Sequence, residues 1–219
     1  METTLLSGAA GRQVVEEQLR LAIVRGDVAP GHRLVEGELS ELYRVTRSSA
    51  RLALDALVAE GLVERVRNRS ARVRAVSTAE AVGIMECRMV LDGLLSRKAA
   101  EHATDERVER LQANLQAMRT AVEERDLLKY TDLIQEHHKL VQETADHPVA
   151  SGLVERLQAQ IVRFQFQLSL RPGRAQRSLA ELERVVDAIV ARDPDRAEAA
   201  AHDHLRGVIA AVLDEAVAQ

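Results

Sequence analysis

The 219-residue sequence contains one cysteine, no tryptophan, two tyrosines and two phenylalanines. A single cysteine, Cys87, cannot form an intramolecular disulfide or a CxxC metal site, so a disulfide-stabilised fold is excluded and a reducing compartment is expected. Long uncharged apolar runs and an opening basic-then-apolar segment are also lacking, which leaves a membrane span or a signal peptide without support. With 46% hydrophobic residues, the chain has enough apolar side chains for an ordinary core. These features favour a soluble cytoplasmic protein.

Charge is unevenly distributed along the chain. The formal net charge is -4, but residues 1–76 carry 12 arginines and 10 acidic residues, whereas the remainder carries 18 basic and 24 acidic residues. The arginines of the first part gather in two segments, 44–51 and 65–74. A basic first part joined to an acidic second part indicates a nucleic-acid-binding module fused to a domain with another role.

The first 76 residues show the pattern of three helices followed by a hairpin. Apolar residues recur at helical spacing in the first predicted helix, which ends at a turn containing Pro30 and Gly31. Two further helices are joined by a three-residue connection, and alternating apolar and polar residues follow them as in a β-hairpin. The predicted elements cover 11–25, 36–43, 47–60, 62–66 and 71–76. Three helices and a basic hairpin predict a winged helix-turn-helix domain.

From residue 77 onward the sequence predicts helices only. A capping-box pattern begins at Ser77, and Asp193-Pro194 has the form of a helix start, with an N-cap followed by proline at the first helical position. No strand-like alternation of useful length occurs, and the expected connections are short, as in a helical bundle. The predicted helices cover 78–102, 105–124, 127–145, 149–170, 175–192 and 195–217.

The third predicted helix carries hydrogen-bond donors in its first turns. Arg47 and Arg51 are four residues apart and share a helix face, where guanidinium groups suit the O6 and N7 atoms of guanine. Short hydroxyl side chains suit phosphate oxygens. A solvated helix face is the alternative, but the basic hairpin beside it favours DNA binding. The candidate contacts are Thr46, Arg47, Ser48, Ser49 and Arg51 in the helix and Arg67, Asn68 and Arg69 at the hairpin tip. Arg65, Arg72 and Arg74 are expected to have structural roles.

Several basic side chains of the second part fall where helical periodicity predicts the interior. Arg88 lies in an otherwise apolar stretch, so its guanidinium needs an anionic partner. His138 and His204 raise a metal hypothesis, because neutral imidazole is a common ligand, although a single helical histidine is more often a satisfied or exposed side chain. Arg163 offers a second guanidinium, with a surface arginine as an equal alternative.

Four segments of the first part carry a recognisable motif: Gly26–Leu34, Glu38–Leu42, Val45–Leu54 and Glu60–Val63. Together they resemble the winged-helix signature of the GntR family of bacterial transcription regulators. The resemblance implies that Arg47 and Arg51 contact the operator and that the wing tip near residues 67–68 enters the minor groove. Gly37 stands where some members of the FadR-like branch have a DNA-contacting arginine, and Leu52 stands where an acid is usual. Both departures leave the operator sequence open.

Three motifs of the second part also belong together: Glu86-Cys87-Arg88, His138 with Pro148, and Asp193 with Ala197 and His204-Leu205. They resemble the FCD ligand-binding domain of FadR-like regulators over nearly its full length. Many such domains bind a divalent metal through one aspartate and three histidines, and the metal and a nearby arginine receive the carboxylate of a small organic acid. His138 and His204 match two ligands, but Ile134 and Leu182 stand at the other two positions. The resemblance therefore implies an incomplete, weak metal site at most.

The sequence predicts a mainly α-helical protein, with a winged helix-turn-helix domain over 1–76 and an all-helical effector-binding and dimerisation domain over 77–219. We expect a homodimeric transcription regulator, a repressor, whose binding to a palindromic operator responds to a small carboxylate. The candidate effector-binding residues are Arg88, His138, Arg163 and His204. An apolar, metal-poor cavity favours an aromatic or fatty carboxylate over a chelating hydroxy acid. An architectural DNA-binding protein whose second part only dimerises is the main alternative. A helical metalloenzyme is a remote one, because a carboxylate cluster and a nucleophile-base pair are missing.

Overall fold

The computed structural model describes residues 5–66 and 70–218, except for the side chains of residues 70, 162, 163, 166 and 215–218. The chain folds into two compact units. The first comprises Met1–Ser77 with Gln158–Arg163, and the second comprises Thr78–Leu157 and Phe164–Gln219. The predicted fold class is confirmed: a winged helix-turn-helix is followed by helices alone.

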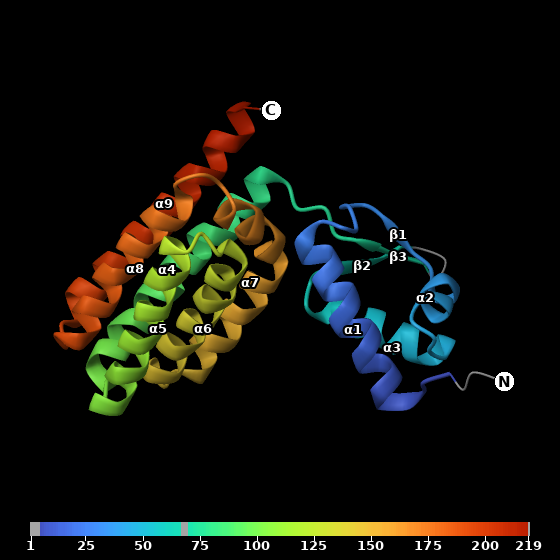
Figure 1. The fold of residues 1–219 in the computed structure, drawn as a ribbon, viewed down its shortest axis with the longest axis horizontal. Coiled ribbons are helices and arrows are strands. Elements are labelled where there is room, and N and C mark those ends of the chain that lie inside the picture. Colours follow the sequence, from blue (N-terminus) through green and yellow to red (C-terminus); the bar gives the residue numbers. More distant parts are fainter. Residues whose placement is uncertain (1–4, 67–69, 219) are drawn as a thin grey trace. The chain divides into compact units, whose positions relative to one another are not determined.

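The first unit contains three helices and a small sheet (Figure 1). The strands pair antiparallel in the order β1-β3-β2, and β2 and β3 form the predicted hairpin. The sequence does not predict β1, because two residues are too few to show an alternating pattern. Its elements are α1 (Gly8–Arg25), β1 (Arg33–Leu34), α2 (Glu36–Leu42), α3 (Arg47–Ala59), β2 (Val63–Val66) and β3 (Ser70–Val73).

The core of the first unit lies between α1, α3 and the sheet. Val15, Leu19 and Ile23 follow one another at four-residue intervals, so that one face of α1 is buried. They pack in one cluster with Leu54 and Leu57 of α3, both fully buried. This packing fixes α3 by one face and leaves its opposite face open to solvent.

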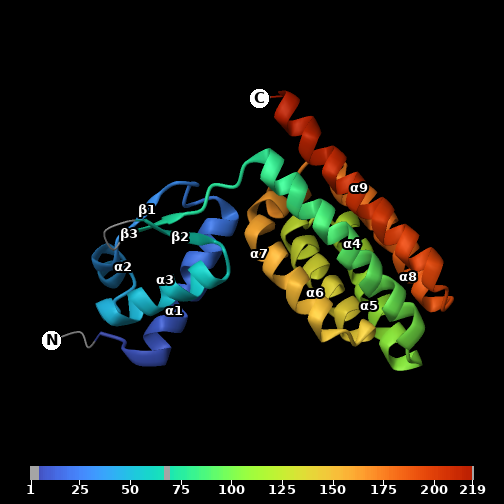
Figure 2. The ribbon, with the colours of Figure 1, turned by 180° about the vertical axis from the view of Figure 1, so that it is seen from behind.

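The second unit is built from six long helices of the described residues, apart from Gln158–Arg163 of α7, which are grouped with the first unit (Figure 2). They are α4 (Thr78–His102), α5 (Asp105–Glu123), α6 (Leu127–Ala145), α7 (Pro148–Ser169), α8 (Arg174–Val190) and α9 (Pro194–Ala218). The predicted start of the last helix is confirmed, because the Asp193 side chain accepts a hydrogen bond of 3.1 Å from the Arg196 amide. Helix α4 packs against α6, α8 and α9, and α8 packs against α5 and α9.

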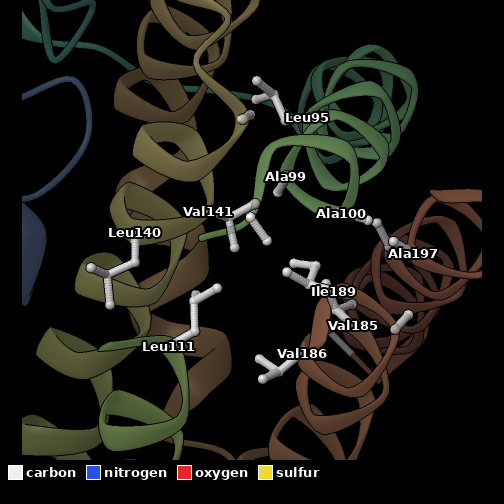
Figure 3. Close-up of a cluster of buried hydrophobic side chains, with 14 of the residues drawn as sticks. Leu95, Ala99, Ala100, Leu111, Leu140, Val141, Val185, Val186, Ile189 and Ala197 are labelled. Atoms are coloured by element: carbon white, nitrogen blue, oxygen red, sulfur yellow. The ribbon is translucent and has the colours of Figure 1, made fainter. Parts of the chain in front are cut away.

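The main core of this unit collects apolar side chains from all six of its described helices, and Figure 3 shows part of it. Leu95 of α4, Leu111 of α5, Val141 of α6 and Ile189 of α8 converge there with Ala197 of α9. A second cluster contains Met118, Tyr130, Ala175 and Leu182. The two clusters hold α4, α6, α8 and α9 around the two chambers described below. None of the described helices is long and apolar enough to cross a membrane.

Candidate DNA-reading helix and ligand cavity

The start of α3 presents several of the residues predicted to contact DNA. Thr46 is the N-cap, and its Oγ1 accepts a hydrogen bond of 3.3 Å from the Ser49 amide. The Thr46 hydroxyl also lies 2.9 Å from that of Ser48. The side chains of Arg47, Ser48 and Arg51 are exposed. Three of the predicted contacts therefore point into solvent from the first two turns of one helix.

Ser49 is an exception, because its burial argues against the predicted DNA contact. The residue is fully buried, and its Oγ donates a hydrogen bond of 3.3 Å to the Gly8 carbonyl at the start of α1. A Cβ at Gly11 would lie 2.7 Å from the Leu6 carbonyl oxygen and 2.9 Å from Ser49 Oγ, so glycine is what lets α1 approach. Its residue type suits a phosphate contact, but the helix turns Ser49 toward the start of α1 instead.

Arg47 lies over the surface of α2. A Cβ built on Gly37 would be 3.8 to 4.0 Å from the guanidinium atoms of Arg47, so the two positions are in van der Waals range. Leu52, on the same helix as Arg47, is half exposed. The two departures from the family motif therefore both lie at or beside the exposed face of α3, where they are placed to alter sequence preference.

In the described part of the hairpin, Arg65 and Arg72 pair with acidic side chains of the protein itself. Arg67, Asn68 and Arg69 lie outside the described residues, and their role as DNA contacts stays a prediction. Arg65 donates to Asp55 of α3 at 2.5 Å, and Arg72 forms an ion pair with Glu64 across the hairpin. These pairs agree with the structural role expected for Arg65 and Arg72.

The second unit contains two adjoining pockets, called here the larger and the smaller chamber. The larger chamber lies among α6, α7, α8 and α9 and holds about 490 Å³, including its open mouth. The smaller chamber lies among α4, α6, α8 and α9 and holds about 370 Å³. His138 and His204 line both chambers, so these two predicted site residues are brought together at the boundary between them.

Arg88 is buried, as the sequence predicts. It is only 1% exposed, and its Nη2 donates to Asp92 Oδ2 at 2.9 Å. Asp92 lines the smaller chamber, so the anionic partner that Arg88 requires is supplied one helical turn away. The Nε and Nη1 atoms of Arg88 are buried without a hydrogen-bond partner. Such groups are costly to leave unpaired, which marks this edge of the guanidinium as a candidate anion contact.

Two neighbouring histidines of α6, His137 and His138, line the chambers in the neutral form. Burial, followed by the positive charge of Arg88, holds the pKa of His138 well below its usual range. His137 is 1% exposed and lines the smaller chamber, and burial lowers its pKa to about 4. The sequence predicts His138 and not His137 as a site residue. The two histidines are adjacent on one helix, and only the packing shows that both side chains are enclosed.

An ion-pair network on α8 and α9 joins the predicted His204 to Arg174 and Glu181, which the sequence does not predict. Arg174, 5% exposed, donates to both Glu181 oxygens at 3.2 and 3.0 Å, and His204 Nδ1 lies 2.8 Å from Glu181 Oε2. Burial raises the pKa of Glu181, but these hydrogen bonds and charges outweigh it, and the net pKa is lowered. The ionised carboxylate only accepts, so His204 Nδ1 donates and the ring orientation is fixed.

The sequence does contain a signal that could have indicated the pairing of Arg174 with Glu181. Arg174 begins a helix, where a cation faces the positive end of the helix dipole and needs a compensating anion. Glu181 lies seven residues later, two turns along the same face. A Cβ at Gly207 would lie 2.5 Å from Glu181 Oε1, so a glycine of α9 leaves the space that the carboxylate occupies.

Most hydroxyl groups lining the larger chamber are already paired. The Tyr130 hydroxyl donates to the Ala175 carbonyl at 3.1 Å, and burial raises its pKa to about 12, so it stays neutral. Thr131 Oγ1 bonds the Leu127 carbonyl and the Ser169 hydroxyl. Gln165 differs, because its Oε1 is buried without a partner. The predicted Arg163 side chain lies outside the described residues.

The donors present do not fit the metal site that the family resemblance implies. Ile134 lines the larger chamber and Leu182 the smaller one, so hydrocarbon stands where a carboxylate and an imidazole would be needed. His204 Nδ1 is committed to Glu181. Within residues 5–66 and 70–218, no group of three or more histidine, cysteine or acidic side chains is arranged to hold a metal ion. Closed and catalytic sites use three or four protein ligands, and only His138 and His204 are in place.

A winged helix with an exposed basic helix, followed along the chain by a helical unit, is an architecture of DNA-binding transcription regulators. Residues 12–73 match the family of bacterial regulatory proteins named gntR, and residues 83–207 match the FCD domain. The chain belongs to the GntR family and carries an FCD domain. Members of this family are transcription regulators and not enzymes.

Named relatives are consistent with this assignment. The chain is 30% identical over 225 residues to the HTH-type transcriptional repressor NanR of Salmonella newport strain SL254, covering 90% of this chain and 84% of that protein. It is 27% identical over 208 residues to the repressor RspR of Escherichia coli strain K12, covering 95% and 91%. In fold it resembles E. coli McbR/YncC, with a TM-score of 0.79, 18% identity and coverage of 95% and 99%. A GntR regulator of Rhodococcus sp. RHA1 gives a TM-score of 0.76, 20% identity and coverage of 94% and 99%.

Proposed function

We propose that this regulator is a homodimeric repressor whose operator binding responds to a small organic acid held in the cavity of the second unit. Two relatives bear the name repressor, which supports this sign of regulation. Two copies are required because one winged helix reads only one half of a palindromic operator. The acid acts by favouring one arrangement of the two reading helices over the other.

On the DNA side, Arg47 and Arg51 are the base-reading candidates. Both are exposed and lie one turn apart on α3, and the other face of this helix is held by the buried core. Each guanidinium can pair with the O6 and N7 atoms of guanine in the major groove. Ser48, exposed beside Arg47, is a candidate phosphate donor. Thr46 has its Oγ1 engaged as the helix cap, which makes it a positioning residue first.

On the effector side, the observation that carries the proposal is the unpaired edge of Arg88. Its Nε and Nη1 atoms are buried without a partner while Asp92 occupies only Nη2. A carboxylate that accepts from this edge satisfies both orphaned donors in a bidentate pair. His138 and His204, on the wall between the chambers, are placed to add hydrogen bonds to the acid.

Separate variants test the DNA-reading helix of the first unit and the effector site of the second unit. Operator duplexes are selected from random DNA with the wild-type protein, and binding is followed by fluorescence anisotropy at constant salt. We expect Arg51→Ala to lose sequence-specific binding. We expect Arg88→Ala to bind the operator normally but to lose stabilisation by, and response to, benzoate and hexanoate in the presence of a chelator.

Two controls separate function from folding. The double variant Arg88→Met with Asp92→Leu removes both charges, so no buried charge is left unpaired. Arg206→Ala removes an exposed arginine of α9 and leaves the response unchanged. A ligand response that survives in both Arg88 variants contradicts the proposed effector site. Complete absence of ligand stabilisation in the wild type, with intact operator binding, instead supports an architectural DNA-binding protein. Stoichiometric metal that survives purification contradicts direct capture of the acid.

A further inference from the structure

We infer that the effector is a monocarboxylic acid with an apolar body and a hydroxyl group at the end remote from its carboxylate, and that Gln165 recognises this hydroxyl. The inference rests on the proposed function, because it assigns the carboxylate to Arg88. It adds a second contact, in the larger chamber, that sets the chemical class of the ligand.

Unsatisfied atoms in and beside the two chambers include two opposite kinds, and His137 Nδ1 in the smaller chamber is also without a partner. Arg88 leaves two buried donors without acceptors, whereas Gln165 leaves a buried acceptor, Oε1, without a donor. Both kinds of orphan are energetically unfavourable in the empty protein. A ligand that offers an anion at one end and a donor at the other satisfies both, whereas a simple fatty or aromatic acid satisfies only the first.

The two contacts lie at adjoining chambers: Gln165 lines the larger one, and Arg88 lines neither chamber but is paired with Asp92 of the smaller one. His138 and His204 line both, so the two chambers adjoin at these imidazoles. The ligand that we infer extends past them from one chamber to the other. An elongated molecule therefore fits better than a compact one.

The wall along this route is largely hydrocarbon. Ile134, Leu168 and Val208 line the larger chamber, and Leu182 with Leu95 lines the smaller one. Burial of apolar ligand surface against these side chains contributes to binding in proportion to the area removed from water. An aliphatic chain or an aromatic ring between the carboxylate and the hydroxyl matches this lining.

Charge distinguishes a hydroxyl from an ammonium group at the far end. The titratable side chains lining the larger chamber are Tyr130, His138, Arg174 and His204. The nearby anion is Glu181, and its two oxygens already accept from Arg174 and His204. An ammonium group would enter without a free counter-ion and close to a buried arginine, which is costly. A hydroxyl needs only the carbonyl oxygen of Gln165.

Matched pairs of ligands test the inference. The probes are 4-hydroxybenzoate against benzoate and 6-hydroxyhexanoate against hexanoate, with 6-aminohexanoate as the cationic analogue. Binding to the full chain is measured by calorimetry in chelator. In at least one pair we expect the hydroxylated member to bind about tenfold more tightly, because only it satisfies Gln165. We expect the amino analogue to bind more weakly than hexanoate.

Protein variants connect the preference to Gln165. Gln165→Leu is expected to reduce the preference for the hydroxylated acid to about one, with little change for the unsubstituted member. Gln167→Leu, an exposed position on the same helix, is the matched control and keeps the preference. Retention of the preference in Gln165→Leu overturns the inference even if the variant is less stable, because the ratio within a pair does not depend on the folded fraction.

The remaining outcomes separate this inference from the proposed function. If both members of every pair bind equally and require Arg88, the effector site stands and the assignment of Gln165 fails. Preferential binding of 6-aminohexanoate also overturns the hydroxyl assignment. If no member of any pair binds, both the carboxylate site and the inference built on it are contradicted.

Discussion

Acidification should destabilise the second unit through His137. In the unfolded chain this imidazole takes up a proton near pH 6.5, whereas burial lowers its folded pKa to about 4. Between these values the unfolded state binds more protons than the folded state. The contribution of His137 to the free energy of unfolding is therefore fully present above about pH 6.5 and decreases as the pH falls toward 4. The full difference corresponds to about 3 kcal/mol, and about 2.5 kcal/mol of it is lost at about pH 4.5.

Urea unfolding followed by circular dichroism measures this loss. The free energy of unfolding is determined at about pH 7.5, 6.0 and 4.5 at one fixed protein concentration. His137→Gln, which cannot titrate, is expected to lose about 2.5 kcal/mol less than the wild type over this range. His32→Gln, at an exposed position of the first unit, is the control and follows the wild type. Equal losses in His137→Gln and the wild type would refute the view that His137 is buried as a neutral base.

Two further predictions concern the packing that supports the two functional regions. Leu54→Ala, at a fully buried position behind the reading helix, should lower the free energy of unfolding by about 2 to 5 kcal/mol, as measured by urea titration. Glu181→Gln should cost about 3 to 5 kcal/mol, because it leaves the buried Arg174 without its counter-charge. The double variant Glu181→Leu with Arg174→Met should recover most of this loss in the same assay, and equal instability of the single and double variants would contradict the explanation.

The helical framework could be predicted almost completely from local patterns. The starts and ends of the helices depend on caps and turns, such as Asp193 before Pro194 and the left-handed Gly26 after α1. These features act within one or two helical turns, so the sequence shows them directly. The short strand β1 is different, because its two residues are extended only through pairing with β3.

The candidate site could be predicted only in part, because most of its energetics depends on contacts between distant segments. The burial of Arg88 follows from its apolar neighbours, and the structure confirms it. The burial of Ser49 follows from the approach of α1 instead, and the role of Glu181 depends on His204, 23 residues away. No periodicity within one helix reveals which residue of another helix completes a hydrogen bond.

The cavity is better understood as a set of internal charge pairs than as a damaged metal site. Loss of a metal removes two positive charges, and a cavity of free carboxylates would then be unstable. Here each buried arginine has one carboxylate, Asp92 for Arg88 and Glu181 for Arg174, so the charges of the empty cavity are balanced. A ligand gains little by charge alone from such a cavity. It gains by completing hydrogen bonds that the protein leaves open, and in and beside the chambers these lie on Arg88, His137 and Gln165. Affinity and selectivity should therefore depend on the positions of donors and acceptors along the ligand more than on its net charge.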